Sequence, residues 1–150
     1  LSIGKKRYVE VEERMKEIAQ IMSKNREYFL NDIDKDADTY RLVIDAYNLP
    51  KKSEKEILIR KEKIQEAVKI ATIVQMELAE RVYKLLDVIN ETLQIGNINT
   101  ITDGKVGLLA CKMSLKAAVM NVYVNLEQVN DKKFVSEMKS KCQEMENNSY

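Results

Sequence analysis

The stretch GNINTITDGKVGLLACKMSLKAAVMNVYVNL, residues 96–126, decides the fold of this chain. It opens on a loop rich in Gly and Asn, and Thr102 then stands where a helix N-cap is expected. Asp103, just inside, complements the positive end of the helix dipole. From Val106 onward, apolar residues lie on nearly every side, which predicts a buried helix. Three lysines interrupt the apolar run, so we do not expect it to span a membrane.

The same helix carries what we call the polar stripe: Asp103, Gly107, Ser114, Asn121 and Asn125. Its members are four or seven residues apart, and such steps return to nearly the same face of a helix. Two interpretations fit this pattern. The asparagines are either buried polar groups that neighbouring helices satisfy, or they line a ligand pocket in an apolar surround.

The N-terminal third predicts an amphipathic helix over residues 5–30. Lys5 and Lys6 open it as a basic cluster, which is either a solvated helix end or a contact for an anionic ligand. The apolar face consists of Val11, Met15, Ile18 and Met22.

The segment NDIDKDADTY, residues 31–40, alternates aspartates in a way that first suggests a calcium loop. An EF-hand needs Gly at its sixth position and Glu at its twelfth, and this chain has Ala37 and Val43 there, so we reject calcium. The spacing predicts a helix that ends before Pro50. Alternatively, residues 27–48 are one continuous helix. The apolar face of this helix is predicted to be Tyr40, Val43, Ile44 and Tyr47.

Ser53 and Glu56 form a capping box that begins another helix. Its helical period lasts to about residue 94, which would span roughly 60 Å if unbroken. A last amphipathic helix and a frayed polar tail over residues 146–150 complete an all-α, orthogonal or up-down bundle, which we expect to pack around residues 103–126. The last helix has an apolar face of Phe134, Met138, Cys142 and Met145.

The composition restricts the function. A length of 150 residues with 45% hydrophobic content suits a single domain, and a net charge of +1 argues against a nucleic-acid partner. The chain has no histidine, which excludes Ser-His-Asp and Cys-His catalysis and disfavours a transition-metal centre. Cys111 and Cys142 form no CxxC motif, so we expect reduced structural thiols in a cytoplasmic protein.

Several motifs in order resemble those of the cyclodeaminase/cyclohydrolase family, which includes the cyclodeaminase domain of formiminotransferase-cyclodeaminase and the bacterial methenyltetrahydrofolate cyclohydrolases. The resemblance covers essentially the whole chain as one domain. Family members usually begin with a further helix and a Gly-Gly-Gly-Ser turn, which we expect this chain to lack. The motifs are Leu1-Ser2-Ile3-Gly4-Lys5-Lys6-x-Tyr8, Ile33-Asp34-x-Asp36-Ala37, Ala46-Tyr47-x-Leu49-Pro50-Lys51, Gly96-Asn97-x-Asn99, Thr102-Asp103, Gly107 and Asn121-x-x-x-Asn125-Leu126.

This resemblance implies chemistry on folate one-carbon units. The first expectation is a formimidoyltetrahydrofolate cyclodeaminase, which forms 5,10-methenyltetrahydrofolate and ammonia. The alternative is a methenyltetrahydrofolate cyclohydrolase, which opens the same bridge to 10-formyltetrahydrofolate. A non-catalytic helical interaction protein with the family fold is a further alternative.

The resemblance also implies roles for particular residues. Without histidine, Asp103 is the expected proton carrier, with Asp36 as the second carboxylate. We expect no metal and no tightly bound cofactor beside the tetrahydrofolate substrate, no membrane partner, and a homodimer. The residues expected to bind substrate are Lys5 and Lys6, toward a glutamate or polyglutamate tail, and Asn97, Asn99, Asn121 and Asn125, toward the pterin.

Overall fold

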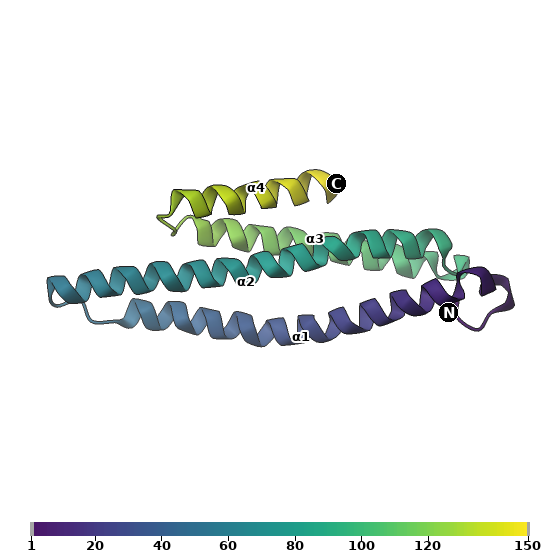
Figure 1. Ribbon diagram of the computed structural model, residues 1–150, viewed down its shortest axis with the longest axis horizontal. Coiled ribbons are helices and arrows are strands. Elements are labelled where there is room, and N and C mark those ends of the chain that lie inside the picture. The colour runs from purple at the N-terminus through teal and green to yellow at the C-terminus, as the bar shows by residue number, and fades with distance from the viewer. Residues whose placement is uncertain (1, 150) are drawn as a thin grey trace.

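Four long α-helices and two short 3-10 segments form the part of the chain that the computed structural model describes, residues 2–149, and no strand occurs there. Successive α-helices run in opposite directions, so the topology is up-down (Figure 1). This confirms the predicted all-α bundle. The elements are η1 (Lys6–Val11), α1 (Glu12–Asn48), α2 (Glu54–Ile95), η2 (Ile98–Thr100), α3 (Ile101–Leu126) and α4 (Lys132–Ser149).

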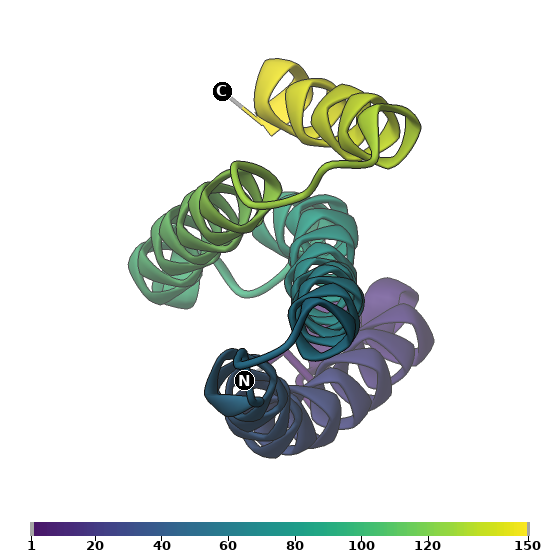
Figure 2. The same cartoon turned by 90° about the vertical axis from the view of Figure 1, so that its left-hand side faces the viewer.

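Helix α2 is the centre of the bundle. It has 42 residues and lies between α1 on one side and α3 on the other, while α4 covers α2 and α3 (Figure 2). The α2–α3 contact uses small residues, since Ala79 and Ala118 are at most 2% exposed and let the two helices approach closely. The prediction that residues 103–126 form the central helix is therefore wrong. The main core consists of Met76, Ala79, Val82, Leu86, Leu115, Ala118, Val119, Val122, Leu126, Cys142 and Met145.

Helix α3 is buried on one side only. Leu115, Val119 and Val122 are at most 1% exposed against α2. The opposite side, which we call the outer apolar face, is 58–71% exposed, so the expectation of burial on all sides is also wrong within one chain. The reason is that apolar side chains favour removal from water but do not specify what covers them. The outer apolar face consists of Val106, Leu109, Met113, Met120 and Val124.

The first helix is one continuous element rather than two. Helix α1 runs through the Asp-rich segment to Asn48, which confirms the continuous alternative for residues 27–48. Its predicted start is replaced by η1, which is distorted at Tyr8 (φ −117°, ψ 19°). Of the apolar face predicted over residues 40–47, Val43 packs against the core, as predicted. The prediction is wrong for Tyr40, Ile44 and Tyr47, which are 40–66% exposed, because the smaller Ala46 makes the close contact with α2 instead.

The start of α2 agrees with the prediction, whereas the predicted cap of α3 does not. The capping box is confirmed, since the Glu56 N–H donates to Ser53 Oγ at 3.3 Å and the Ser53 N–H donates to Glu56 Oε2 at 3.0 Å. Thr102 is not the N-cap of α3, because the helix begins at Ile101, directly after the 3-10 turn of η2. Thr100 occupies the N-cap position instead. Asp103 lies in the first turn, as predicted.

The C-terminal helix is longer than predicted. Cys142 and Met145 are buried on its apolar face, which confirms that face. The helix reaches Ser149, which is only 5% exposed, so the tail expected to fray is helical up to this residue; Tyr150 lies outside the described residues. Cys111 and Cys142 are both free thiols, as predicted, and burial raises the pKa of each.

Candidate functional site

The first cavity contains Asp103, and we call it the Asp103 cavity. It has a volume of about 260 Å³ and lies where the N-terminal part of α1, the end of α2 and the start of α3 meet. The Asp103 carboxylate is on the first turn of α3, where the helix dipole favours a negative charge. The lining residues are Ser2, Met15, Thr92, Leu93, Gly96, Asn97, Thr100, Ile101, Asp103 and Gly104.

Two motifs that are about ninety residues apart in the sequence meet beside this cavity. The Asn97 N–H donates to Ser2 Oγ at 2.9 Å, and Tyr8 Oη donates to Asn97 Oδ1 at 3.3 Å. The Tyr8 hydroxyl also accepts from the Ile98 N–H at 3.2 Å. The Asn97 side chain accepts from the Asn99 N–H at 3.0 Å and so caps η2. These bonds tie the N-terminal segment to the loop that precedes α3.

Two glycines allow the tight packing at this end of the bundle. A Cβ on Gly96 would lie 2.5 Å from the Thr92 carbonyl oxygen, which is backbone and cannot yield. A Cβ on Gly104 would lie 2.6 Å from Leu93 Cδ2, the far end of a flexible side chain. Only glycine therefore fits unchanged at both positions, and α3 begins close against α2.

The other residues expected at this end lie around the cavity rather than in it. Lys5 and Lys6 are exposed, directly before and at the start of η1, and Asn99 is exposed within η2. The N-terminal segment and the loop before α3 lie at the same end of the bundle (Figure 1). The structure therefore places Lys5, Lys6, Asn97, Asn99 and Asp103 in one region, with the lysines at its rim.

The second cavity contains Asp36, and we call it the Asp36 cavity. It has a volume of about 250 Å³ and is formed by the middle of α1, the middle of α2 and the C-terminal half of α3. Gln75 Nε2 donates to Asp36 Oδ1 at 2.5 Å across this cavity. Asn125, one turn beyond Asn121, is half-buried and does not line it. The lining residues are Phe29, Asp32, Ile33, Asp36, Val74, Gln75, Leu78 and Asn121.

The polar stripe runs along α3 from the Asp103 cavity to the Asp36 cavity, but the two cavities are separate. Asp103 and Asn121 are eighteen residues apart on α3, or roughly 27 Å at 1.5 Å per residue. Both cavities lie between α1 and α3 with α2 as their floor. Within one chain, Asp103 and Asp36 therefore cannot reach the same carbon atom. The interpretation of the asparagines as fully buried groups is wrong at Asn121, which is exposed and lines the Asp36 cavity.

Three polar residues of these cavities received no role from the sequence. Ser2 and Tyr8 belong to a recognised motif, but their hydrogen bonds to residues near position 97 could not be foreseen from it. Gln75 is 7% exposed, and nothing in its sequence context predicted a binding role.

Metal ligands do not converge in the part of the chain that the structure describes: it contains no group of three or more Asp, Glu, Cys or His side chains placed to hold an ion. The alternating aspartates of residues 32–38 lie on a continuous helix, where every second residue points in a different direction. This agrees with the rejection of a calcium loop.

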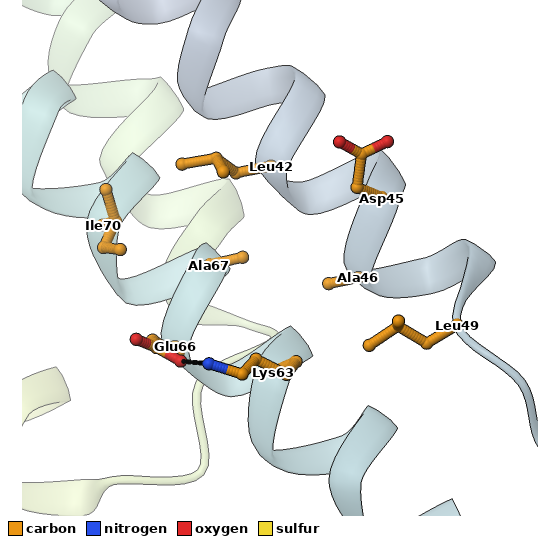
Figure 3. A pocket seen from close by; sticks show the side chains of 8 residues that line it. All are labelled: Leu42, Asp45, Ala46, Leu49, Lys63, Glu66, Ala67 and Ile70. Atoms are coloured by element: carbon orange, nitrogen blue, oxygen red, sulfur yellow. Dashed lines mark hydrogen bonds and ion pairs between the residues drawn. The ribbon is translucent and has the colours of Figure 1, made fainter. Parts of the chain in front are cut away.

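A third cavity, of about 280 Å³, lies at the opposite end of the α1–α2 hairpin (Figure 3). Its walls are apolar, with Leu42, Leu49 and Ile70 among them, and its charged rim holds an ion pair of 2.7 Å between Lys63 and Glu66. No residue of the polar stripe lies there. Because a binding site needs convergent polar groups, we do not regard it as the functional site.

The sequence and the fold both match known proteins. A profile of the family described as Formiminotransferase-cyclodeaminase matches residues 1–144. The chain is 36% identical over 137 residues to a methenyltetrahydrofolate cyclohydrolase from Methylorubrum extorquens, covering 91% of this chain and 66% of that protein. It is 31% identical over 102 residues to the formimidoyltransferase-cyclodeaminase of Rattus norvegicus, covering 68% of this chain and 19% of that protein.

A solved structure has the same fold. The crystal structure of a formiminotetrahydrofolate cyclodeaminase from Thermotoga maritima superposes with a TM-score of 0.78 at 26% identity, and the match covers 97% of this chain and 69% of that chain. One α-helix segment, Ile98–Leu126, would be long and apolar enough to cross a membrane, with a mean hydropathy of 1.2. In the described fold, however, the inner side of that helix packs on α2. From the profile match and these likenesses together, the chain belongs to the formiminotransferase-cyclodeaminase family.

Proposed function

We propose that this chain forms the helical domain of a formimidoyltetrahydrofolate cyclodeaminase. The observation that carries the proposal is the polar stripe of α3, which connects a carboxylate cavity at Asp103 with a second one at Asp36 along an otherwise apolar helix. The names of the relatives supply the substrate class. The chain spans about two thirds of the cyclohydrolase and about one fifth of the rat enzyme, so the activity is our proposal.

The proposed reaction closes a one-carbon bridge. N10 of the folate attacks the carbon of the protonated, cationic formimidoyl group on N5 and gives a tetrahedral adduct with three nitrogen substituents. Asp103 accepts the proton from N10 and returns it to the departing nitrogen, which leaves as ammonia. The methenyl bridge that remains is cationic, and carboxylates stabilise it. Acid–base help of this kind is worth roughly a hundredfold to ten-thousandfold in rate.

A methenyltetrahydrofolate cyclohydrolase is the second candidate. The relative with 36% identity over most of this chain carries that name. In this reaction water attacks the methenyl carbon, a carboxylate accepts a proton from the water, and N5 departs with a proton. The product is 10-formyltetrahydrofolate. The same residues serve both reactions, since each passes through a tetrahedral carbon flanked by nitrogens.

The active unit in this proposal is a homodimer. The outer apolar face of α3 is 58–71% exposed, and an exposed apolar face of this kind is suited to a twofold contact with a second copy. A second copy packed antiparallel about Met113 would place Val106 opposite Met120. The twofold axis keeps both polar stripes on the same side of the contact. Asp103 of one copy then faces the Asn121 end of the other, beside the second copy's Asp36.

This arrangement joins two carboxylates that belong to separate cavities of one chain, since Asp103 and Asn121, which mark those cavities on α3, are roughly 27 Å apart. Each dimer then contains two composite sites, and each site takes Asp103 from one copy and Asp36 from the other. The exposed Lys5 and Lys6 lie near Asp103 and would contact the glutamate tail. We place the enzyme in the cytoplasm, with folate as its small-molecule partner and without a nucleic-acid or membrane partner.

Mixing two inactive variants tests this proposal. Asp103→Asn and Asp36→Asn should each lose activity at least about a hundredfold. A refolded one-to-one mixture should regain roughly a quarter of wild-type activity, because half of its dimers are mixed and each mixed dimer has one intact site of two. Growth of methenyltetrahydrofolate absorbance together with ammonia release measures the deaminase, and decay of the added methenyl compound measures the hydrolase.

The controls separate the possible failures. Each variant refolded alone should stay inactive, and affinity tags should show that mixed dimers form. Inactive mixed dimers would refute the composite site but leave the folate activity of the wild type. A wild-type protein that is silent in both assays would refute the enzyme and favour a helical protein that only keeps the family fold.

A further inference from the structure

Gln75 is the polar group at the floor of the Asp36 cavity. It is 7% exposed, and its Nε2 donates to Asp36 Oδ1 at 2.5 Å. This bond determines the orientation of the amide, because only the nitrogen end can face a carboxylate favourably. Gln75 Oε1 is therefore the end of the same planar amide that does not face Asp36 Oδ1.

The oxygen that results has no hydrogen-bond partner among the described residues. Asp32, which lines the same cavity, pairs through its Oδ2 with Arg81 Nε at 3.6 Å. A buried acceptor without a donor is unfavourable, because it has lost its hydrogen bond to water. The unpaired Gln75 Oε1 and the Asp36 carboxylate are together the complement of a ligand edge that carries adjacent N–H donors.

The walls of the cavity add a shape requirement. Phe29 and Ile33 of α1, with Val74 and Leu78 of α2, enclose the polar floor with apolar side chains, and Asn121 of α3 approaches from the third side. A flat heteroaromatic ring with N–H groups on one edge satisfies both the walls and the floor. A flexible aliphatic amine would satisfy only the floor.

We propose that the Asp36 cavity binds the 2-amino-4-oxopyrimidine edge of the pterin ring. The ring N3–H and the 2-amino group are adjacent donors, and they would donate to the Asp36 carboxylate and to Gln75 Oε1. This inference rests on the proposed function and deepens it, since it assigns the pterin to Asp36 and Gln75 and leaves the proton transfer to Asp103. In this arrangement Gln75 is a binding residue that the sequence alone did not identify.

Fragment binding tests this assignment. The probes are 6-hydroxymethylpterin, which holds the pterin without the tail, and p-aminobenzoylglutamate, which holds the tail without the pterin. Gln75→Met keeps approximately the same side-chain volume and removes the amide. It should weaken pterin binding about tenfold in calorimetry, as the loss of one or two hydrogen bonds predicts, and leave p-aminobenzoylglutamate binding unchanged. Gln94→Met, an exposed glutamine of the same helix, is the matched control.

Kinetics gives a second readout. Gln75→Met should raise KM for the folate substrate with little change in kcat, since the hydrogen bonds form equally in the ground state and the transition state. Asp36→Asn, which keeps the shape of the side chain, should weaken pterin binding more than Gln75→Met does, because it removes the charge that accepts from the ring, and it guards against misfolding of the first variant.

The outcomes distinguish this inference from the proposed function. Unchanged pterin affinity in both variants, with an active wild type, would overturn the pterin site and leave the proposed function standing. Pterin binding that depends on Gln75 in a wild type without turnover would support the site and remove the enzyme. A wild type that binds neither fragment would overturn the inference.

Discussion

The two sides of α3 have similar compositions and opposite surroundings. The inner side places Leu115, Val119 and Val122 against α2 with at most 1% exposure. The outer apolar face leaves Leu109 and Met113 about two thirds exposed, at 67% and 71%. The difference teaches that an apolar sequence shows a preference for leaving water and not the identity of the partner. In our proposal, the inner side makes the fold and the outer side makes the dimer.

The largest effect should come from truncating the inner side. Leu115→Ala removes a side chain that is 1% exposed and leaves a cavity against α2, so it should lower the free energy of unfolding by about 2–5 kcal/mol. Leu109→Ala, the matched truncation on the outer face, should cost less than about 0.5 kcal/mol in a monomer. Denaturant titrations of both variants measure the contrast.

Protein concentration sharpens this experiment. If a second copy covers the outer face, the cost of Leu109→Ala should rise with protein concentration, while the cost of Leu115→Ala should be large at every concentration. Equal costs for both variants in dilute solution would mean that the outer face is buried within a single chain, contrary to the fold described above.

A charge on the outer face should give the next largest effect. Met113→Glu places two carboxylates at the centre of the proposed twofold contact, so it should convert the dimer to a monomer with unchanged helical content. Light scattering after size exclusion measures the mass, and circular dichroism measures the helix. Leu30→Glu, on an exposed position of α1, is the control and should leave the mass unaltered. A Met113→Glu protein that stays dimeric would place the interface elsewhere.

The smallest effect should come from the contact between α3 and α4, where Tyr123 and Cys142 have raised pKa values. Burial, with the hydrogen bond of 3.0 Å to Glu146, raises the pKa of Tyr123 to about 12. Burial, followed by the charge of Glu146, raises the pKa of Cys142 to about 11. Both groups are acids whose ionised forms the fold disfavours. Their contribution to the free energy of unfolding is complete below their ordinary pKa values of 10 and 9, and it is lost as the pH rises through the raised pKa values.

We therefore expect the melting temperature to fall between about pH 9 and pH 12. A Tyr123→Phe, Cys142→Ala double variant should show a shallower fall over the same range, although it is less stable at neutral pH. Thermal melts at several pH values, with tyrosinate absorbance as the titration signal, provide the measurement. Parallel curves for wild type and double variant would show that other groups cause the alkaline loss.

The features of the candidate site also fall into two groups, those that the sequence predicted and those that only the packing of the helices revealed. The polar stripe, Asp103 in a first helical turn and the capping box at Ser53 were all predictable, because each depends on residues within a few positions along one helix. The pairing of Gln75 with Asp36 was not, since these residues are 39 positions apart and meet only when α1 packs on α2. The same holds for the bond between Tyr8 and Asn97, which are 89 positions apart.

The sequence by itself determined which segments are helical, which face of α4 is apolar, and the family to which the motifs belong. Only the tertiary structure decided that α2 is the central helix, that α3 leaves one apolar face in solvent, and that the polar stripe serves two cavities. The physical reason is one of range. Helix periods and caps depend on hydrogen bonds and contacts between neighbours in the chain, whereas packing depends on which small side chains, such as Ala79 and Ala118, allow distant helices to approach.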